Sequence, residues 1–238
     1  MQNTEYQILE SSSPSKEMAK TFISNVFSWM FVGLMLTGVL AYWFGNNPAY
    51  MQLLVSETGM TPLGYVIMFA PIGFVLLMSY GFNKFSYPLI LALFLGYAAI
   101  MGLSLSFIFL VYDIGSIYLT FGITAATFGL MAILGYTTQI DLTKFGSFMM
   151  MGLFGIVIAS LINMFVGSEK MDYIISIIGV VVFTGLTAYD VQKIKTMGAE
   201  IETGTASASK LAIMGALNLY LDFINLFLML LRLFGDRK

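Results

Sequence analysis

The sequence predicts an all-α membrane protein with seven transmembrane helices. Of its 238 residues, 58% are hydrophobic and 10% are charged, and the mean hydropathy is +0.87. A soluble domain could not cover that much apolar surface. The chain also has uncharged runs that are long enough, or nearly so, to cross a hydrocarbon core of about 30 Å, which takes roughly 20 helical residues. These runs are 21–56, 58–83, 85–112, 114–140, 145–168 and 173–189, and the apolar stretch 211–231 adds a seventh.

The helices follow from these runs and from the residues that bound them. Pro62 and Pro88 suit helix starts, where a missing N–H costs little. We place the helices at 24–45, 62–82, 87–111, 115–136, 146–167, 172–194 and 211–231. They form one transmembrane domain (24–231) between a polar N-terminal tail (1–23) and a short basic C-terminal tail (232–238). The N-terminal tail lacks the pattern of a cleaved signal, so we expect the first helix to be retained.

The positions of the basic residues predict the orientation. Seven lie on the side of the N-terminus and four on the other side: Lys16, Lys20, Lys84, Lys144, Lys193, Lys195 and Lys210 against Lys170, Arg232, Arg237 and Lys238. Cytoplasmic loops carry the excess of Lys and Arg. We therefore expect a multi-pass protein of a bacterial cytoplasmic (inner) membrane, with its N-terminus in the cytoplasm and its C-terminus outside.

Two missing residue types limit the chemistry that the protein can perform. The chain has no histidine and no cysteine, which excludes zinc sites with these ligands, histidine proton relays and thiol catalysis. Proton or cation chemistry must then use carboxylates, hydroxyls and amides. We expect no cofactor, no nucleic-acid partner and no enzyme activity.

Polar side chains in the last two helices form the candidate site. Asp222 lies near the middle of an apolar helix, where an aspartate costs about 2.5–3.5 kcal/mol. Asn218 and Asn225 share its helix face at spacings of four and three residues. On the preceding helix, Thr184, Thr187 and Asp190 also share a face. Because both helices reach the same membrane side, Asp190 and Asp222 could meet below the cytoplasmic surface.

A meeting of the two aspartates would have a specific consequence. Two carboxylates within hydrogen-bond reach cannot both ionise cheaply, so they would titrate as a unit and share one proton near neutral pH. Loss of that proton would leave a doubly negative site, which repels itself open or transiently binds a hard cation such as Ca²⁺. The sequence thus supports the hypothesis of a pH-sensitive cation path.

Three segments resemble the bacterial branch of the Bax inhibitor-1 family, also called transmembrane Bax inhibitor motif proteins. They are GLTAYDVQKIK (185–195), LNLYLDFINLFLMLLRLFG (217–235) and GYTTQIDLTKFGSF (135–148). The third departs from the family, which often has basic residues where this chain has Gln139 and Ile140. The likeness covers essentially the whole chain.

The resemblance implies a bundle whose last helix is central, with helices 1–3 and 4–6 packed around it. It also implies a pH-dependent calcium leak, with Asp190 and Asp222 as the di-aspartyl sensor and protons, Ca²⁺ and membrane lipids as partners. Some members are thought to latch the pair with a basic residue on helix 2, but 58–83 contains no Lys or Arg. Bacterial relatives are also linked to modulation of membrane proteases.

Other functions remain open at this point. One alternative is a regulatory membrane protein that transports nothing and binds a membrane protease or another partner, with Asp222 only holding helices together. A proton-coupled transporter is another, although no pair of broken helices in matching halves supports it. An intramembrane aspartyl protease is the enzyme alternative, and it ranks behind the regulatory protein. Bulky residues precede Asp222 where such proteases have glycines, and a peptide and a water need room.

Overall fold

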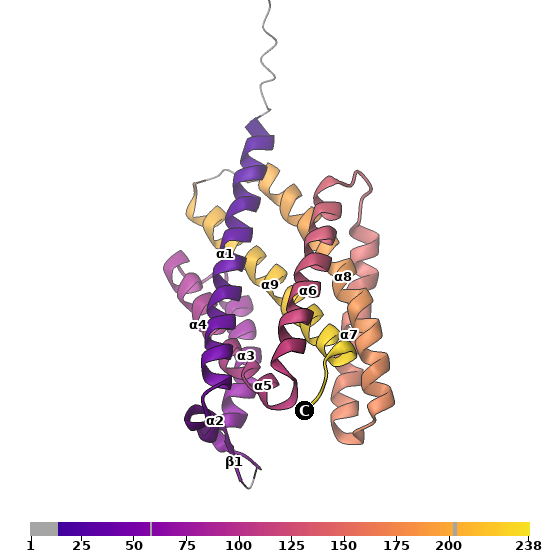
Figure 1. Ribbon diagram of the computed structural model, residues 1–238. Coiled ribbons are helices and arrows are strands. Elements are labelled where there is room, and N and C mark those ends of the chain that lie inside the picture. The colour runs from indigo at the N-terminus through magenta and orange to yellow at the C-terminus, as the bar shows by residue number, and fades with distance from the viewer. Residues whose placement is uncertain (1–13, 58, 202–203) are drawn as a thin grey trace, which may run out of the picture.

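The computed structural model describes residues 14–57, 59–201 and 204–238, and this part of the chain is a helical bundle (Figure 1). Within the described residues, seven segments are long and apolar enough to cross a membrane. They are Glu17–Gly45, Pro62–Gly81, Tyr87–Val111, Ile114–Thr137, Thr143–Val166, Glu169–Glu200 and Ala206–Phe234. The predicted fold class is therefore confirmed.

The first half of the chain contains three of these spans. The elements are α1 (Pro14–Gly45), α2 (Pro48–Leu54), α3 (Pro62–Gly81), α4 (Tyr87–Leu105) and the short α5 (Ile108–Val111). A small antiparallel hairpin, β1 (Val55–Ser56) with β2 (Gly59–Met60), precedes α3 and pairs Val55 with Met60. The Thr61 hydroxyl then accepts the backbone N–H of Gly64 at 3.1 Å and caps α3.

The second half contains the other four spans: α6 (Ile114–Thr137), α7 (Thr143–Val166), α8 (Glu169–Glu200) and α9 (Ala206–Phe234). The hydroxyls of Ser168 and Thr205 cap α8 and α9 by accepting the N–H groups of Met171 and Ala208. Gly167 ends α7 in the left-handed conformation, with φ +65°, which glycine adopts without a steric penalty.

Several helix ends differ from the predicted ones. α1 begins at Pro14, not at 24, so only residues 1–13 of the predicted tail precede it, and these lie outside the described residues. α8 continues to Glu200, and α9 starts at Ala206. The added turns are rich in Lys, Glu, Ala and Met, which favour a helix whether or not lipid surrounds them. The predicted helix 87–111 is interrupted after Leu105, and α5 completes the span.

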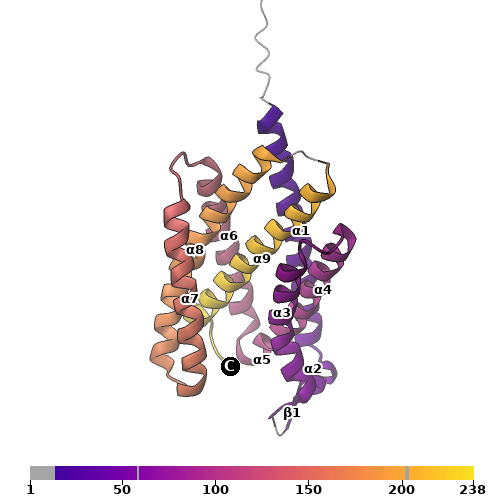
Figure 2. The same ribbon diagram turned by 180° about the vertical axis from the view of Figure 1, so that it is seen from behind.

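α9 is the central helix. It runs obliquely through the molecule, with α3 and α4 on one side and α6, α7 and α8 on the other (Figures 1 and 2). It contacts α1, α4, α6 and α8. In its most apolar stretch 72% of the residues are buried, against 17% in α3 and in α7.

Glycines let α6 and α7 approach α8 closely. A Cβ atom on Gly135 of α6 would stand 2.2 Å from the carbonyl oxygen of Ala188. A Cβ atom on Gly146 of α7 would stand 2.3 Å from the ring of Tyr189. Small residues at helix contacts are typical of membrane bundles, where close backbone packing stabilises the association. These two contacts fix the helices on either side of Tyr189 and Asp190.

The C-terminal segment is tied to the start of α6. The N–H of Asp113 donates to the carbonyl of Asp236, and the N–H of Lys238 donates to the carbonyl of Val111, both at 3.0 Å. The Ser116 hydroxyl donates to the Asp236 carboxylate at 2.9 Å. The predicted tail 232–238 is thus divided: its first three residues end α9, and the rest joins α5 and α6.

Candidate functional site

Asp222 lies in the interior of the bundle. Its side chain is 6% exposed, and the two residues before it on α9, Tyr220 and Leu221, are fully and partly buried. Its Oδ2 atom is buried and has no hydrogen-bond partner among the residues that the structure describes. An unpaired buried carboxylate oxygen costs free energy, so the position demands either a proton or an ion.

Asp190 faces this site from α8. It is partly buried, on a helix that packs closely against α9. The two aspartates thus lie on adjacent helices. Lys193 lies one turn beyond Asp190 along α8. No hydrogen bond joins the two aspartates among the residues that the structure describes, and their action as a pair stays a prediction.

The neutral residues predicted beside the pair lie in different surroundings. The hydroxyls of Thr184 and Thr187 donate to carbonyls of their own helix, those of Val180 and Phe183. The amide of Asn225 donates to the carbonyl of Leu221 at 2.8 Å. Asn218 is exposed, whereas Asp222 is buried. Within this structure, hydrogen bonds join none of these four side chains to the aspartates.

A buried hydroxyl cluster next to Asp222 was missed in the sequence. The Tyr220 hydroxyl is 2.7 Å from the Thr37 hydroxyl of α1, which also bonds the carbonyl of Ala98 on α4 at 2.8 Å. The ring of Tyr97 packs edge-on against Tyr220, with centroids 5.5 Å apart. The Tyr97 hydroxyl is buried and has no hydrogen-bond partner among the described residues. Through these contacts, Tyr220 of α9 is joined to α1 and α4.

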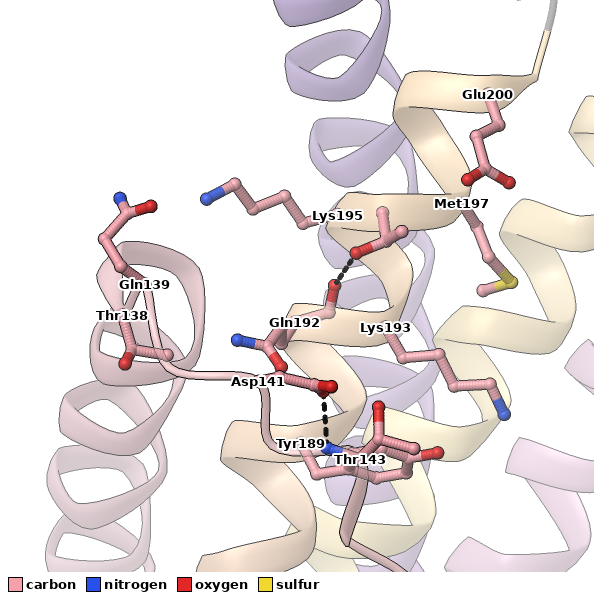
Figure 3. Close-up of a pocket in the computed structure, with 11 residues that line it drawn as sticks. Thr138, Gln139, Asp141, Thr143, Tyr189, Gln192, Lys193, Lys195, Met197 and Glu200 are labelled. Carbon is pink, nitrogen blue, oxygen red and sulfur yellow. Dashed lines mark hydrogen bonds between the residues drawn. The ribbon is translucent and has the colours of Figure 1, made fainter. Parts of the chain in front are cut away.

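A polar cavity of about 530 Å³ lies at the end of α8, beyond Asp190 (Figure 3). The α6–α7 loop and the last turns of α8 line it, and Tyr189, Lys193, Lys195 and Glu200 are among its walls. Lys193 and Lys195 extend in opposite directions from α8 (Figure 3). Lys195 donates to the carbonyl of Tyr136 at 2.7 Å and lies over its ring.

Gln192 holds the α6–α7 loop against α8. Its amide group donates to the carbonyl of Ile140 and its carbonyl accepts the N–H of Leu142, both at 2.8 Å. Asp141 in the same loop accepts the N–H of Thr143 at 2.9 Å. Hydrogen bonds from the hydroxyl and the backbone of Thr143 lower the pKa of Asp141 below its usual value. Asp141 is therefore ionised throughout the neutral pH range.

A second polar cavity, of about 590 Å³, lies at the opposite end of α8. Its walls include Asn163, Asp172 and Arg232, and the Asp172 carboxylate is 3.7 Å from the Arg232 guanidinium. The Asn163 side chain bonds both Ser168 and Asp172. Both membrane ends of α8 thus open into polar cavities.

Apolar side chains separate the two cavities. The buried residues of α8 between Ser176 and Thr187 are Gly179, Val182, Phe183, Gly185 and Leu186. On α9, Phe223, Leu226, Phe227 and Leu230 are buried at corresponding depths. A hydrated ion cannot cross such a region, because nothing there replaces its water ligands.

The pair alone is too small for a permanently bound metal ion. No group of three or more acidic residues that could hold a metal lies within residues 14–57, 59–201 and 204–238. Ca²⁺ takes six to eight oxygen ligands, and two aspartates supply at most four.

The fold defines a polytopic membrane protein with a buried carboxylate, that of Asp222, on its central helix. A family model described as "Inhibitor of apoptosis-promoting Bax1" matches residues 19–238. The chain therefore belongs to that family, the Bax inhibitor-1 family.

Three relatives are similar to nearly the whole chain. Inner membrane protein YbhL of Escherichia coli is 47% identical over 220 residues, which cover 92% of this chain and 93% of the relative. An uncharacterised protein of Borreliella burgdorferi is 47% identical over 91% of this chain and 92% of its own length. An uncharacterised protein of Rickettsia prowazekii is 44% identical, with 93% and 92% covered.

Proposed function

We propose that the protein is a pH-sensitive leak channel for calcium and similar cations, gated by protonation of Asp190 and Asp222. The observation that carries this proposal is the buried Asp222, whose Oδ2 lacks a partner among the described residues and whose helix packs against that of Asp190. An asparagine would join helices at lower cost, so a carboxylate at this depth favours a functional role.

A single proton shared by the pair would keep α8 and α9 together. When that proton leaves, two negative charges face each other in a medium of low dielectric constant, where their repulsion is strong. The helices then separate at the aspartates, and water and cations enter. Protonation reverses the step. The gate therefore opens as the pH rises and closes as it falls.

The polar cavities at the two ends of α8 would serve as the entrances of the path. The apolar stretch between them, from Gly179 to Leu186, would be the barrier that opening must wet. Carboxylate oxygens are hard ligands, which suit Ca²⁺ better than a soft metal ion. Calcium would be the permeant ion and not a resident cofactor.

A transport role fits the surroundings of Asp222 better than peptide hydrolysis. Leu219 and Tyr220 are fully buried beside it, and they leave no room for a peptide and an attacking water. We therefore propose that the pair exchanges protons and contacts cations without catalysis.

The same proposal includes an orientation. The start of α1, the α6–α7 loop, the end of α8 and the start of α9 lie at one end of the molecule, and the C-terminus lies at the other (Figure 1). The first end carries seven of the eleven basic residues, which favours the cytoplasm. The relative YbhL is named an inner membrane protein, and the bacterial inner membrane is the location proposed here.

The test is Ca²⁺ entry into dye-loaded vesicles that contain the purified protein, between about pH 6 and 8, where a shared carboxylate proton would be exchanged. We expect wild-type flux to rise with pH, and folded Asp190→Asn and Asp222→Asn variants to lose that dependence. Asp141→Asn is the matched control. Asp141 stays ionised throughout this range because its pKa is lowered, so this variant must retain the pH response.

Two outcomes would contradict the proposal. If folded wild-type protein gives no more flux than empty vesicles, the chain is better described as a regulatory membrane protein that transports nothing, with a membrane protease as one class of partner. If flux occurs but both aspartate variants keep the wild-type pH response, the channel is gated elsewhere.

A further inference from the structure

An apolar groove of about 590 Å³ lies between α1 and α6, with α9 as its floor. Gly38 of α1 and Ala125 of α6 line its walls, and Phe223 and Phe227 of α9 line its floor. The rims carry large exposed hydrophobic side chains, such as Met35 at 52% and Tyr118 at 55% exposure. The volume lies in the range, about 300–1,000 Å³, of sites that hold small organic ligands.

The medium around the groove determines what fills it. Its walls belong to the membrane spans Glu17–Gly45 and Ile114–Thr137. The buried hydroxyl in its wall, that of Thr37, already bonds Tyr220 and the carbonyl of Ala98. Water entering the groove would find few partners, and an empty groove would forfeit dispersion contacts along its whole lining. A hydrocarbon chain from the surrounding bilayer satisfies both conditions.

A positive charge lies next to one of the residues that line the groove. The backbone carbonyl of Phe109, a lining residue, accepts a hydrogen bond from the Lys238 ammonium at 2.7 Å. The backbone of Lys238 is itself fixed to Val111. One of the three ammonium donors is used in this way, which leaves two for an anion. Among the neighbouring charges, the Asp236 carboxylate is bonded to Ser116.

We propose that this groove is a phospholipid site, in which one acyl chain packs on Phe223 and Phe227 and the phosphate contacts Lys238. Lys238 lies beside the end of α5, close to the polar residue Asp113. A lipid headgroup would lie at this depth in the membrane. The bound lipid comes from the leaflet on the C-terminal side. This site adjoins the proposed path, because Phe223 and Phe227 line the groove and also belong to the apolar stretch between the two polar cavities. Its test does not depend on ion flux.

The test uses protein in phospholipid vesicles that include a phospholipid with a photoreactive diazirine on one acyl chain. After irradiation, mass spectrometry maps the adducts. We expect the groove residues to carry several times more label than exposed residues on the outer faces of α3 and α7, such as Leu76 and Phe154. A diazirine-bearing diacylglycerol, which has no phosphate, should label the groove about tenfold less, as expected for loss of a charge-assisted hydrogen bond.

Three variants test whether the labelled lipid occupies this groove. Gly38→Leu should fill part of the groove, because Gly38 lines it and a Cβ atom there meets nothing within 4 Å, and should reduce groove labelling several-fold. Gly73→Leu is the matched control, since Gly73 also faces open space on α3. Lys238→Gln should remove the preference for the phosphate-bearing probe and leave the fold unchanged.

Two results would overturn the proposal. The first is labelling that is even over the lipid-facing surface, which would indicate ordinary boundary lipid only. The second is groove labelling that Gly38→Leu and Lys238→Gln both leave unchanged, which would mean that the probe reacts there without occupying this site.

Discussion

Asp222 and Tyr220 show how two polar residues on one helix can serve different purposes. Tyr220 bonds Thr37 and packs against Phe94 and Tyr97, so it joins α9 to α1 and α4. Asp222 keeps a buried oxygen without a partner among the described residues. A residue that only held helices together would be expected to use both of its oxygens. The contrast supports the functional reading of the aspartate.

Lys193 should influence the pH at which flux rises, because it lies one turn from Asp190 on α8 and a nearby positive charge favours the ionised form of a carboxyl group. In Lys193→Gln the proton is held more tightly, so the rise in flux should move to higher pH. The shift should be at most about 0.7 pH unit, since an exposed ion pair is worth about 0.2–1 kcal/mol. Flux measured against pH at low salt checks this.

Lys195→Gln is the control for that measurement. Lys195 donates to the carbonyl of Tyr136 and lies over its ring. The Lys195→Gln variant should therefore leave the pH of half-maximal flux unchanged. An equal shift in both variants would point to a general surface-charge effect and would contradict the specific role of Lys193.

Tyr220→Phe should lower the free energy of unfolding by about 0.5–1.5 kcal/mol, the usual contribution of one hydrogen bond. Thr37 keeps its bond to the carbonyl of Ala98, so no buried donor is left unpaired. Reversible unfolding in mixed micelles, with Tyr87→Phe as a control outside the cluster, measures the difference. No loss of stability would mean that the hydroxyl contact contributes nothing.

The sequence singles out the aspartates more clearly than the residues around them. Asp222 stands out because a charge within an apolar helix is costly. Tyr97 and Tyr220 do not stand out among 13 tyrosines, many of which suit a membrane interface. Asn218 was placed by helical spacing alone, which fixes a face but not what that face meets. Only the packing of α1, α4 and α8 decides that.

At the scale of elements, the close approach of α6 to α8 depends on Gly135. A Cβ atom there would lie 2.2 Å from a backbone oxygen, which cannot move as a side chain does. Gly135→Ala should therefore destabilise the protein by about 1–3 kcal/mol, as overpacking typically does. Gly122→Ala on the same helix meets nothing within 4 Å and should have little effect on unfolding. Equal stabilities of the two variants would show that α6 is free to shift.

Helix existence could be predicted from the sequence, whereas helix ends could not. The spans follow from hydrophobic length, which the bilayer thickness fixes. The ends of α1 and α8 follow instead from helix propensity and capping beyond the bilayer, where no hydrophobic signal exists. The break between α4 and α5 also lacks a signal, because no proline or charge lies near Ser106.

At the scale of the whole molecule, long-range contacts determine what the sequence leaves open. The hydrogen bond between Ser116 and Asp236 joins residues that are 120 positions apart in the sequence. Neither residue type predicts such a pairing. The number of spans could be predicted from composition and run length. The central place of α9 was implied by family resemblance, since apolar residues on all faces are compatible with several arrangements of seven helices.

The proposed orientation can be tested directly because the chain contains no cysteine. Single variants Lys84→Cys, Lys144→Cys and Lys170→Cys place a thiol at exposed positions. In intact cells, a membrane-impermeant maleimide should label Lys170→Cys and should reach the other two only after the membrane is opened. The reverse pattern would place the N-terminus outside.

The central claim is that Asp190 and Asp222 share one proton, and infrared difference spectroscopy of the protein in lipid tests it most directly. Titration of the wild type should show one protonated carboxyl signal that disappears over the same pH range in which flux rises. Because the two groups titrate as a unit, either Asp190→Asn or Asp222→Asn should move or abolish that signal. If each variant instead removes a separate titration and leaves the other unchanged, the aspartates are independent and the proposed gate is wrong.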